Sequence, residues 1–311
     1  GVVNIITKKN KHPYWINFVL KNDNPIGITH SINSGFNKGI LNYSLDIQNA
    51  KSDGYDLTPN PQYVYNMTLD ENSSLVLNHR AIISLSDKHI FNINYKDYSS
   101  RINRYEYFAG NLIIDAPLNR YADEYYNFKY DCKISNNQSF KVSYIEEKYT
   151  KYYYYPYYYS DNEHIFNPGE FINGSLDRQE INFQYNSENV KSKHLIGLES
   201  YHEDYSSFNI YYPDGNILLE SIFEAQDMTQ SENNVSLYFY EERNFKNNQI
   251  LSFGLRIQNI SKEDIMLPSL SYLIKGNNDY NYRISYSSGY RSPSIKERYY
   301  NWKDHFGGPS I

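Results

Sequence analysis

Hydrophobic and polar residues alternate along almost the whole of this 311-residue chain. Successive side chains of a β-strand point to opposite faces of a sheet, so each alternating segment would have one apolar and one polar face. No comparably long run has the spacing of an amphipathic helix. The clearest alternating segments are Leu41–Ile47, Phe91–Lys96, Ile181–Tyr185, Leu251–Gln258 and Tyr282–Tyr286. The pattern therefore predicts an all-β fold.

Short polar turns alternate with long polar or aromatic connections. The short turns are expected at Asn37–Gly39, Ser86–Lys88, Asn136–Asn137, Glu188–Lys193, Lys246–Asn248 and Lys275–Asp279. The long connections are expected at Ala50–Ser74, Ser99–Asn119, Tyr149–Asp177, Ser206–Glu232 and Ser261–Met266, with a shorter first link at Asn22–Pro25. About thirteen strands lie between them, each long enough for the ~9–11 residues that a tilted strand needs to cross a bilayer. Short turns at one end and long loops at the other are typical of a transmembrane antiparallel β-barrel.

The charged residues of the clean segments support the same interpretation. Asp46, Lys96, Arg256 and Arg283 all fall on the polar face of their segments. A Lys or Arg that faces lipid at the bilayer midplane costs about 2–4 kcal/mol, whereas a water-filled lumen tolerates it. A soluble β protein with one wet face would show the same alternation, and the pattern favours the barrel over that alternative.

Composition and charge exclude several functional classes. The 36 Tyr residues suit strands at a half-wet surface, because the ring is apolar and the hydroxyl can still meet water. A net charge of −6 without a Lys/Arg cluster argues against nucleic acid as a partner. Cys132 is the single cysteine, which rules out an internal disulfide framework and makes a small apolar side chain its expected role. No run of 18 apolar residues is present, so no transmembrane helix is expected, whereas a barrel strand is apolar only at alternate positions.

The first nine residues carry a short signature. Gly1 and the apolar pair Val2-Val3 are followed by Asn4, Ile5, Ile6, Thr7 and Lys8, and barrel-like strands begin directly afterwards. This string resembles the end of the plug domain in TonB-dependent receptors, where a glycine, an apolar pair and Asn-Ile-Ile-Thr-Lys form the last plug strand before the barrel.

A second signature lies near the other end of the chain. Gly289 precedes Tyr290, Arg291, Ser292 and Pro293, and Ile295, Lys296 and Glu297 follow. This segment resembles the Phe-Arg-Ala-Pro box of the same family, with Tyr in place of Phe and Ser in place of Ala. The stretches Asn233–Ile257 and Ser52–Tyr55 also resemble paired strands and an early loop of that family. The resemblances span nearly the whole chain in the family's order.

The resemblance implies a barrel of 22 strands with a plugged lumen. Residues 1–9 would be the C-terminal end of the plug domain, and residues 10–311 the N-terminal part of the barrel, about 13 of its 22 strands. Both ends of the chain look like truncations. The implied location is the bacterial outer membrane, and the implied partners are outer-membrane lipid, a small-molecule ligand and the TonB complex, which would be reached through a missing N-terminal region.

Enzyme motifs are absent from the sequence. It contains no Gly-x-Ser-x-Gly elbow, no phosphate-cradling Gly-Lys-Ser/Thr loop and no His-Glu-x-x-His zinc motif. We therefore expect no catalytic residues and no required cofactor.

Two groups of residues are candidates for ligand binding. The first is an aromatic cluster around Pro156, which either anchors the barrel at the lipid headgroups as part of the outer aromatic girdle or forms a stacking surface for a bulky ligand. It consists of Tyr152, Tyr153, Tyr154, Tyr155, Tyr157, Tyr158 and Tyr159.

The second candidate is His305, shortly after the Tyr-Arg-Ser-Pro box. In haem receptors of this family a histidine lies in the corresponding loop, and neutral imidazole is a natural axial ligand of haem iron. An ordinary solvated histidine is the alternative.

The expected function is energised uptake of a scarce, bulky nutrient. The resemblance implies haem first, then another iron complex such as a ferric siderophore, or cobalamin, as the transported ligand. The alternatives are a porin or adhesin barrel without energised transport, and a glycan-importing member of the same superfamily. The plug-like segment at residues 1–9 favours the receptor over a simple porin.

Overall fold

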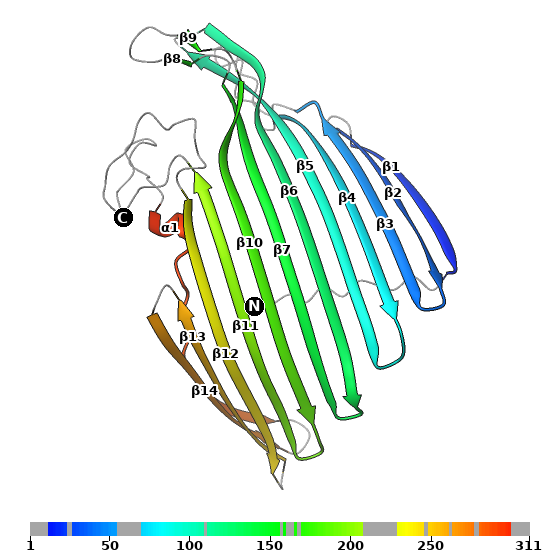
Figure 1. Cartoon of the computed structure of the whole chain (residues 1–311), viewed down its shortest axis with the longest axis vertical. Helices are drawn as coiled ribbons and strands as arrows, with labels where there is room; N and C mark the ends of the chain where they lie inside the picture. The colour runs from blue at the N-terminus through cyan, green and yellow to red at the C-terminus, as the bar shows by residue number, and fades with distance from the viewer. Residues whose placement is uncertain are drawn as a thin grey trace.

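The computed structural model describes residues 12–23, 27–54, 70–108, 111–155, 158–159, 165–166, 169–207, 229–245, 248–260, 263–276 and 280–299. In these residues a single antiparallel sheet contains thirteen strands, which confirms the predicted all-β class and the strand count. Figure 1 shows the sheet curling from β1 at one side to β14 at the other. Its strands are β1 (Tyr14–Asp23), β2 (Gly27–Lys38), β3 (Leu41–Ser52), β4 (Glu71–Ser84), β5 (His89–Phe108), β6 (Asn111–Ser135), β7 (Gln138–Tyr155), β10 (Gly169–Glu188), β11 (Ser192–Ser207), β12 (Thr229–Phe245), β13 (Gln249–Ile260), β14 (Glu263–Lys275) and β15 (Asn281–Ser287).

Each strand of the sheet pairs with the sheet strand that follows it in the chain. A separate hairpin of β8 (Tyr158–Tyr159) and β9 (Ile165–Phe166) lies between β7 and β10, and one short helix, α1 (Ile295–Tyr299), follows β15. No helix in the described ranges is both long and apolar enough to cross a membrane. Successive connections of the meander therefore lie at alternate ends of the strands.

The short turns lie where the alternation predicts them. Gly39, between β2 and β3, has a φ of +59°, and Asn248, just before β13, has a φ of +57°, both in the left-handed region that these residue types tolerate. Before β11, the Oδ1 atom of Asn189 accepts hydrogen bonds from the backbone N–H groups of Lys191 and Ser192 at 2.9 and 2.8 Å. Local hydrogen bonds therefore close these turns tightly.

The long connections are shorter than the sequence predicts. Within the predicted connection Ser99–Asn119, β5 continues to Phe108 and β6 begins at Asn111. The predicted connection Tyr149–Asp177 likewise contains the last residues of β7 and the first residues of β10. Polarity on both faces marked these segments as loops, but a strand that rises into water keeps its hydrogen-bond ladder with polar side chains on both faces.

The two faces of the sheet invert the usual burial pattern of a soluble protein. On β12, Val235 and Leu237 are 48% and 53% exposed, whereas Ser236 between them is 1% exposed. Alternation and cross-strand register place the large exposed hydrophobic side chains on one face of the sheet. We call it the apolar face. These side chains include Ile16, Phe18, Ile32, Ile93, Phe128, Ile181, Phe183, Ile196, Leu198, Phe253, Ile257, Met266, Leu270 and Ile284. Such a face needs lipid, so the sheet is the wall of a membrane barrel.

The opposite face, here called the polar face, carries the charged residues that the alternation assigned to it. Asp46 accepts a hydrogen bond from Asn33, the Nζ atom of Lys96 lies 3.8 Å from a carboxylate oxygen of Asp123, and Arg256 pairs with Glu199 at 2.6 Å. Arg283 follows the same alternation on β15. The sequence prediction for these four residues is confirmed.

The apolar face also shows that the strands are tilted in the membrane. The hydrophobic run is centred near Ile32 on β2 and near Leu270 on β14. Cross-strand register carries Ile32 to Ser231 on β12, and carries Leu270 to Glu241 on the same strand. The run thus shifts by about ten residues of ~3.3 Å over about ten strand spacings of ~4.8 Å. The resulting tilt of about 35° is that of a membrane barrel.

Aromatic side chains line the apolar face toward the end with the short turns. Ring centroids of Phe91 and Tyr130 lie 4.5 Å apart, those of Tyr130 and Phe140 5.5 Å, and those of Phe140 and Phe183 6.1 Å. Cys132, on the same face of β6, is buried and unpaired as expected. The rings of Phe91, Tyr130 and Phe140 lie toward the short turns, as in an aromatic girdle, and Phe183 continues the row into the middle of the hydrophobic run.

Phe183→Arg tests which face meets lipid. Because Phe183 projects from the apolar face near the middle of the hydrophobic run, the substitution should destabilise the full-length receptor in lipid by about 2–4 kcal/mol. Gln184→Arg, one residue away on the polar face, should cost far less. Urea unfolding in lipid vesicles measures both. Equal losses in the two variants would contradict the assignment of the faces.

Candidate functional site

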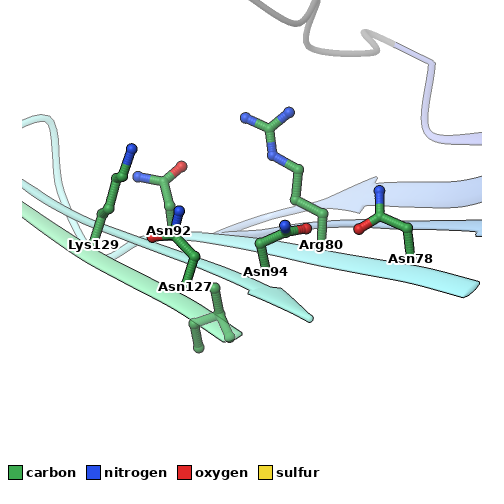
Figure 2. Close-up of a pocket in the computed structure, with 7 residues that line it drawn as sticks. Asn78, Arg80, Asn92, Asn94, Asn127 and Lys129 are labelled. Atoms are coloured by element: carbon green, nitrogen blue, oxygen red, sulfur yellow. The ribbon is translucent and has the colours of Figure 1, made fainter. Parts of the chain in front are cut away.

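The polar face contains a hollow between β4, β5 and β6 with a volume of about 480 Å³. Figure 2 shows six polar side chains of this hollow projecting from the same side of the three strands. They are Asn78, Arg80, Asn92, Asn94, Asn127 and Lys129. The register explains the cluster, because Asn94 lies opposite Arg80 on one neighbour and opposite Asn127 on the other.

The hollow combines two cations with amides that can still accept hydrogen bonds. The Nδ2 atom of Asn127 donates to the Tyr125 hydroxyl at 2.9 Å. The Oδ1 atoms of Asn78 and Asn127 are buried, and within the described residues neither has a hydrogen-bond partner. Buried acceptors of this kind favour a polar occupant that donates hydrogen bonds, and the cations favour oxygen-rich or anionic groups.

A second cluster centres on Arg256 of β13. Its Nη2 atom lies 2.6 Å from Glu199 Oε1 on β11 and donates to Ser236 Oγ on β12 at 2.8 Å, and its Nε atom donates to Gln258 at 3.1 Å. The Glu199 contact passes over the intervening strand. Charge-assisted hydrogen bonds of this kind are strong and fix the guanidinium in place.

Tyr238 makes a similar bridge from β12 to β10. Its hydroxyl donates to Asn182 Oδ1 at 3.2 Å, across β11. The ring lies over Gly197, where a Cβ atom would be 2.1 Å from the Cζ atom of Tyr238. Only glycine leaves room for the ring at that position. Trp15 covers Gly35 in the same way, since a Cβ atom at that position would lie 2.4 Å from the nearest ring carbon of Trp15.

Acidic residues gather on the polar face toward the end with the long connections. Arg178 lies 3.8 Å from Glu147 and 3.2 Å from Glu180. Glu203 lies opposite Arg178 in the register and opposite Glu232 on the other side. Glu203 lies beyond the hydrophobic run, and burial raises the pKa of its carboxyl, with Arg178 opposing and Glu232 adding to the shift.

The segment after β15 folds back onto this acidic region. Glu232, which is 6% exposed, accepts hydrogen bonds from Ser292 Oγ at 3.2 Å and from Arg298. Ile295 is 1% exposed beside them. Two residues of the second sequence signature are therefore placed here: Ser292 contacts Glu232, and Arg291 pairs with Glu297 at 2.5 Å.

Helix α1 begins with a capping box that contains the end of this signature. The Glu297 N–H donates to Ser294 Oγ at 3.3 Å, and Glu297 Oε2 accepts from the Ser294 N–H at 2.8 Å. Pro293 precedes the cap and Tyr290 is exposed. The Ser-Pro-Ser-x-x-Glu pattern thus starts a short helix that Glu232 holds against β12.

The structure describes only some of the residues that the sequence suggests for ligand binding. The Tyr152 ring lies on the apolar side of β7, where the Arg120 guanidinium stacks on it at 3.6 Å from the ring centroid. Tyr153, Tyr154 and Tyr155 belong to β7, and Tyr158 and Tyr159 belong to β8. Tyr157, His305 and the segment Asn4, Ile5, Ile6, Thr7 and Lys8 lie outside the described residues. A binding role for these residues stays a prediction.

Sequence reasoning missed the residues that meet on the polar face. Arg256 and Glu199 are 57 residues apart, and Ser292 and Glu232 are 60 apart. Alternation assigns each of them to a face, but only cross-strand register brings them together. In the described ranges no group of three His, Cys, Asp or Glu side chains is arranged to hold a metal ion.

Comparison with protein families gives one match over most of the chain. The model described as "TonB dependent receptor-like, beta-barrel" matches residues 20–311. No curated protein matches the chain.

Comparison with solved structures gives the same fold. A mutant of the ferric enterobactin receptor PfeA from Pseudomonas aeruginosa is 16% identical, with a TM-score of 0.69 over 95% of this chain and 46% of that one. The siderophore receptor PirA from Acinetobacter baumannii is 16% identical, with a TM-score of 0.68 over 93% of this chain and 45% of that one. The FrpB iron transporter from Neisseria meningitidis (F3-3 variant) is 12% identical, with a TM-score of 0.63 over 86% and 45%. The chain thus spans about half the length of these structures.

Glu232→Gln tests how α1 is held. Removing the carboxylate charge weakens two hydrogen bonds, each of the charged kind that contributes about 1.5–3 kcal/mol. Amide hydrogen exchange of residues 294–299 in the full-length receptor should become at least about tenfold faster. Glu241→Gln, on the same strand, removes a carboxylate whose partner Arg243 is well exposed and should leave this exchange unchanged. Equal exchange in wild type and Glu232→Gln would refute the contact.

The capping box makes the start of α1 sensitive to acid. The Ser294 N–H and the Arg291 guanidinium hold the pKa of the Glu297 carboxyl below its ordinary value of 4.5. This stabilisation is fully present above the ordinary value and is lost as the pH falls through the lowered one. Exchange protection of residues 295–299, corrected for intrinsic rates, should fall between about pH 5 and pH 3. In Glu297→Gln, which has no carboxyl to titrate at this position, protection should stay constant over that range. A variant that loses protection with falling pH as the wild type does would contradict the assignment.

Proposed function

Because the chain belongs to the family of TonB-dependent receptor-like β-barrels, we propose that the protein of which it is part takes up an iron complex across the bacterial outer membrane. The family is one of transporters and receptors of that membrane. The observation that carries the proposal is the tilted sheet with an apolar face toward lipid and a polar, charged face toward the lumen. Such a wall encloses a hydrophilic route for a ligand that cannot cross lipid.

The polar hollow supports an oxygen-rich or anionic cargo. Arg80 and Lys129 provide positive charge, and the amides around them provide donors and acceptors. Ferric siderophores and carboxylate-bearing haem both present oxygen atoms to such a surface. The solved structures with the same fold are described as receptors for ferric enterobactin or siderophores and as an iron transporter. An iron complex is therefore the first candidate for the cargo of this protein.

The energy source belongs to the same proposal. A plugged barrel needs work to rearrange the plug, and the family name gives the TonB complex as the partner that supplies it. Residues 1–9 would be the last plug strand, joined directly to the wall at β1. A porin or adhesin without energised transport is the alternative class, and it predicts uptake that does not depend on TonB.

Uptake by cells that carry the full-length receptor as their sole iron importer tests the function. Growth under iron limitation should be restored by one class among ferric catecholates, ferric hydroxamates and haemin, and should require TonB. Arg80→Gln combined with Lys129→Gln should weaken binding of that class by about tenfold or more. Lys38→Gln combined with Lys88→Gln makes the same charge change in exposed turns and serves as the control. Growth on every iron source without TonB would support the porin class instead.

Haem as the cargo has its own test, because it depends on His305. Haemin binding to the purified receptor and to His305→Ala should differ in affinity and in the absorption spectrum of the bound iron. Unchanged binding would remove His305 as an axial ligand. Absent haemin binding with retained uptake of a ferric siderophore would remove haem and leave the iron-complex proposal intact.

A further inference from the structure

Each short turn of the sheet carries a large exposed apolar side chain at its tip or at the strand end beside it. Val190, at the turn between β10 and β11, is 93% exposed, and Leu85, at the turn between β4 and β5, is 58% exposed. Turns that stand in water are normally built from Gly, Asn, Asp, Ser and Pro, so an apolar residue at every short turn needs a physical explanation. These residues, here called the turn row, are Ile40, Leu85, Ile134, Val190, Phe245 and Tyr280.

The tilt of the strands places the turn row at one height. Cross-strand register from Ile32, with the shift of about one residue per strand, puts the middle of the hydrophobic run at Phe128 on β6 and at Phe183 on β10. Ile134 lies six residues beyond Phe128 toward the short turns, and Val190 lies seven residues beyond Phe183. The same construction leaves every member of the turn row about five to seven residues from the middle of the run. Turns that are far apart in the sequence therefore end at a common level.

That level lies in the headgroup layer of the membrane. At ~3.3 Å per residue and a tilt of about 35°, this separation corresponds to about 14–19 Å from the midplane. The apolar band of a barrel ends about 12 Å from the midplane, and the polar headgroups reach about 20–22 Å. The short turns of outer-membrane barrels lie on the periplasmic side. The turn row is therefore level with the headgroups of the inner leaflet.

A lysine accompanies the apolar residue at each of the four short turns whose residues are all described. These lysines are exposed, and in the described part of the chain none of them pairs with a carboxylate. Asp87 is the one acidic residue in these four connections, and Glu188, at the end of β10, already pairs with Lys193 at 3.0 Å. The four turns together therefore carry net positive charge. Their lysines are Lys38, Lys88, Lys133 and Lys191.

An apolar side chain beside a lysine suits the boundary between acyl chains and headgroups. The apolar group reaches the hydrocarbon, and the flexible stem of lysine lets its ammonium group reach a lipid phosphate. Leu85, Ile134 and Phe245 continue the alternation of the apolar face, so the surface that they extend already meets lipid. A lysine near a membrane surface attracts anionic headgroups with a gain in binding of roughly fivefold for each lysine.

We propose that the turn row and its lysines bind phospholipids of the inner leaflet, with the apolar side chains at the acyl boundary and the ammonium groups on lipid phosphate, and that this contact prefers anionic phospholipid. The contact fixes how deep the barrel sits in the membrane. It lies outside the lumen and does not depend on the cargo.

Native mass spectrometry of the full-length receptor counts the phospholipids that it retains from detergent micelles containing equal amounts of phosphatidylglycerol and phosphatidylcholine. Wild type should retain phosphatidylglycerol at least about fivefold better. Lys88→Gln, Lys133→Gln and Lys191→Gln combined should remove that preference, and arginine at the same three positions should keep it. A preference that survives in the triple glutamine variant would overturn the proposal. Inorganic phosphate that displaces the lipid at equal concentration would also overturn it, because the turns would then attract any phosphate.

The matched control combines Lys96→Gln, Lys141→Gln and Arg283→Gln, which removes the same charge from the polar face. Its preference for phosphatidylglycerol should equal that of wild type. A loss as large as that of the turn variant would contradict the proposal, since the preference would then follow net charge alone.

A depth measurement removes no charge and so remains decisive where the lysine variants fail to fold. Val190→Cys is labelled with a bimane fluorophore in full-length receptor whose native cysteines, Cys132 included, are replaced by serine, and the protein is placed in phospholipid nanodiscs. Phospholipids that carry a nitroxide on the headgroup should quench the label strongly, and iodide in the water should quench it weakly. Iodide quenching as strong as that of the free dye would place the turn in water and overturn the proposal.

Discussion

The structure depends on one constraint: backbone N–H and C=O groups that meet hydrocarbon have no water to bond and must bond to each other. The meander satisfies this constraint, because each strand of the described sheet pairs with its successor over most of its length. Buried hydrophobic side chains contribute little to the sheet, since among the described residues only Ile82, Cys132 and Ile260 of the strands and Ile295 of α1 are buried. Backbone hydrogen bonds between strands and contacts with lipid therefore stabilise the sheet in place of a buried hydrophobic core.

Alternation along the chain predicted the fold class, the strand count and the face of Asp46, Lys96, Arg256 and Arg283, because a period of two is a property of the single strand. Alternation could not predict the tilt of the strands. The shift of the hydrophobic run between Ile32 and Leu270 appears only when the register of every intervening strand pair is known. The connection at Ser99–Asn119 was predicted wrongly because polar residues on both faces look alike in a loop and in a strand that stands in water. His305 and residues 1–9 lie outside the described residues, so the ligand and the plug boundary stay predictions.

The polar face is organised by side-chain contacts that pass over a strand. Arg256 reaches Glu199 from β13 to β11, and Tyr238 reaches Asn182 from β12 to β10. Each needs a small residue or a short side chain beneath it, which explains Gly197 under the Tyr238 ring. The second family signature joins the same face through Glu232. In its described part, this signature forms a capping box at the start of α1 and holds the segment after β15 against β12.

These bridges also have a mechanical consequence. Sliding one strand along its neighbour by two residues keeps every side chain on its face and costs only the ladder bonds that must re-form, so alternation alone does not resist it. A slide at the β11–β12 ladder breaks both the Tyr238–Asn182 and the Arg256–Glu199 bridge, because each bridge joins a strand on one side of that ladder to a strand on the other. A pull on the segment docked at Glu232 is therefore distributed over β10 to β13 as shear in a stiff shell. The two bridges therefore stiffen the wall against sliding at this ladder.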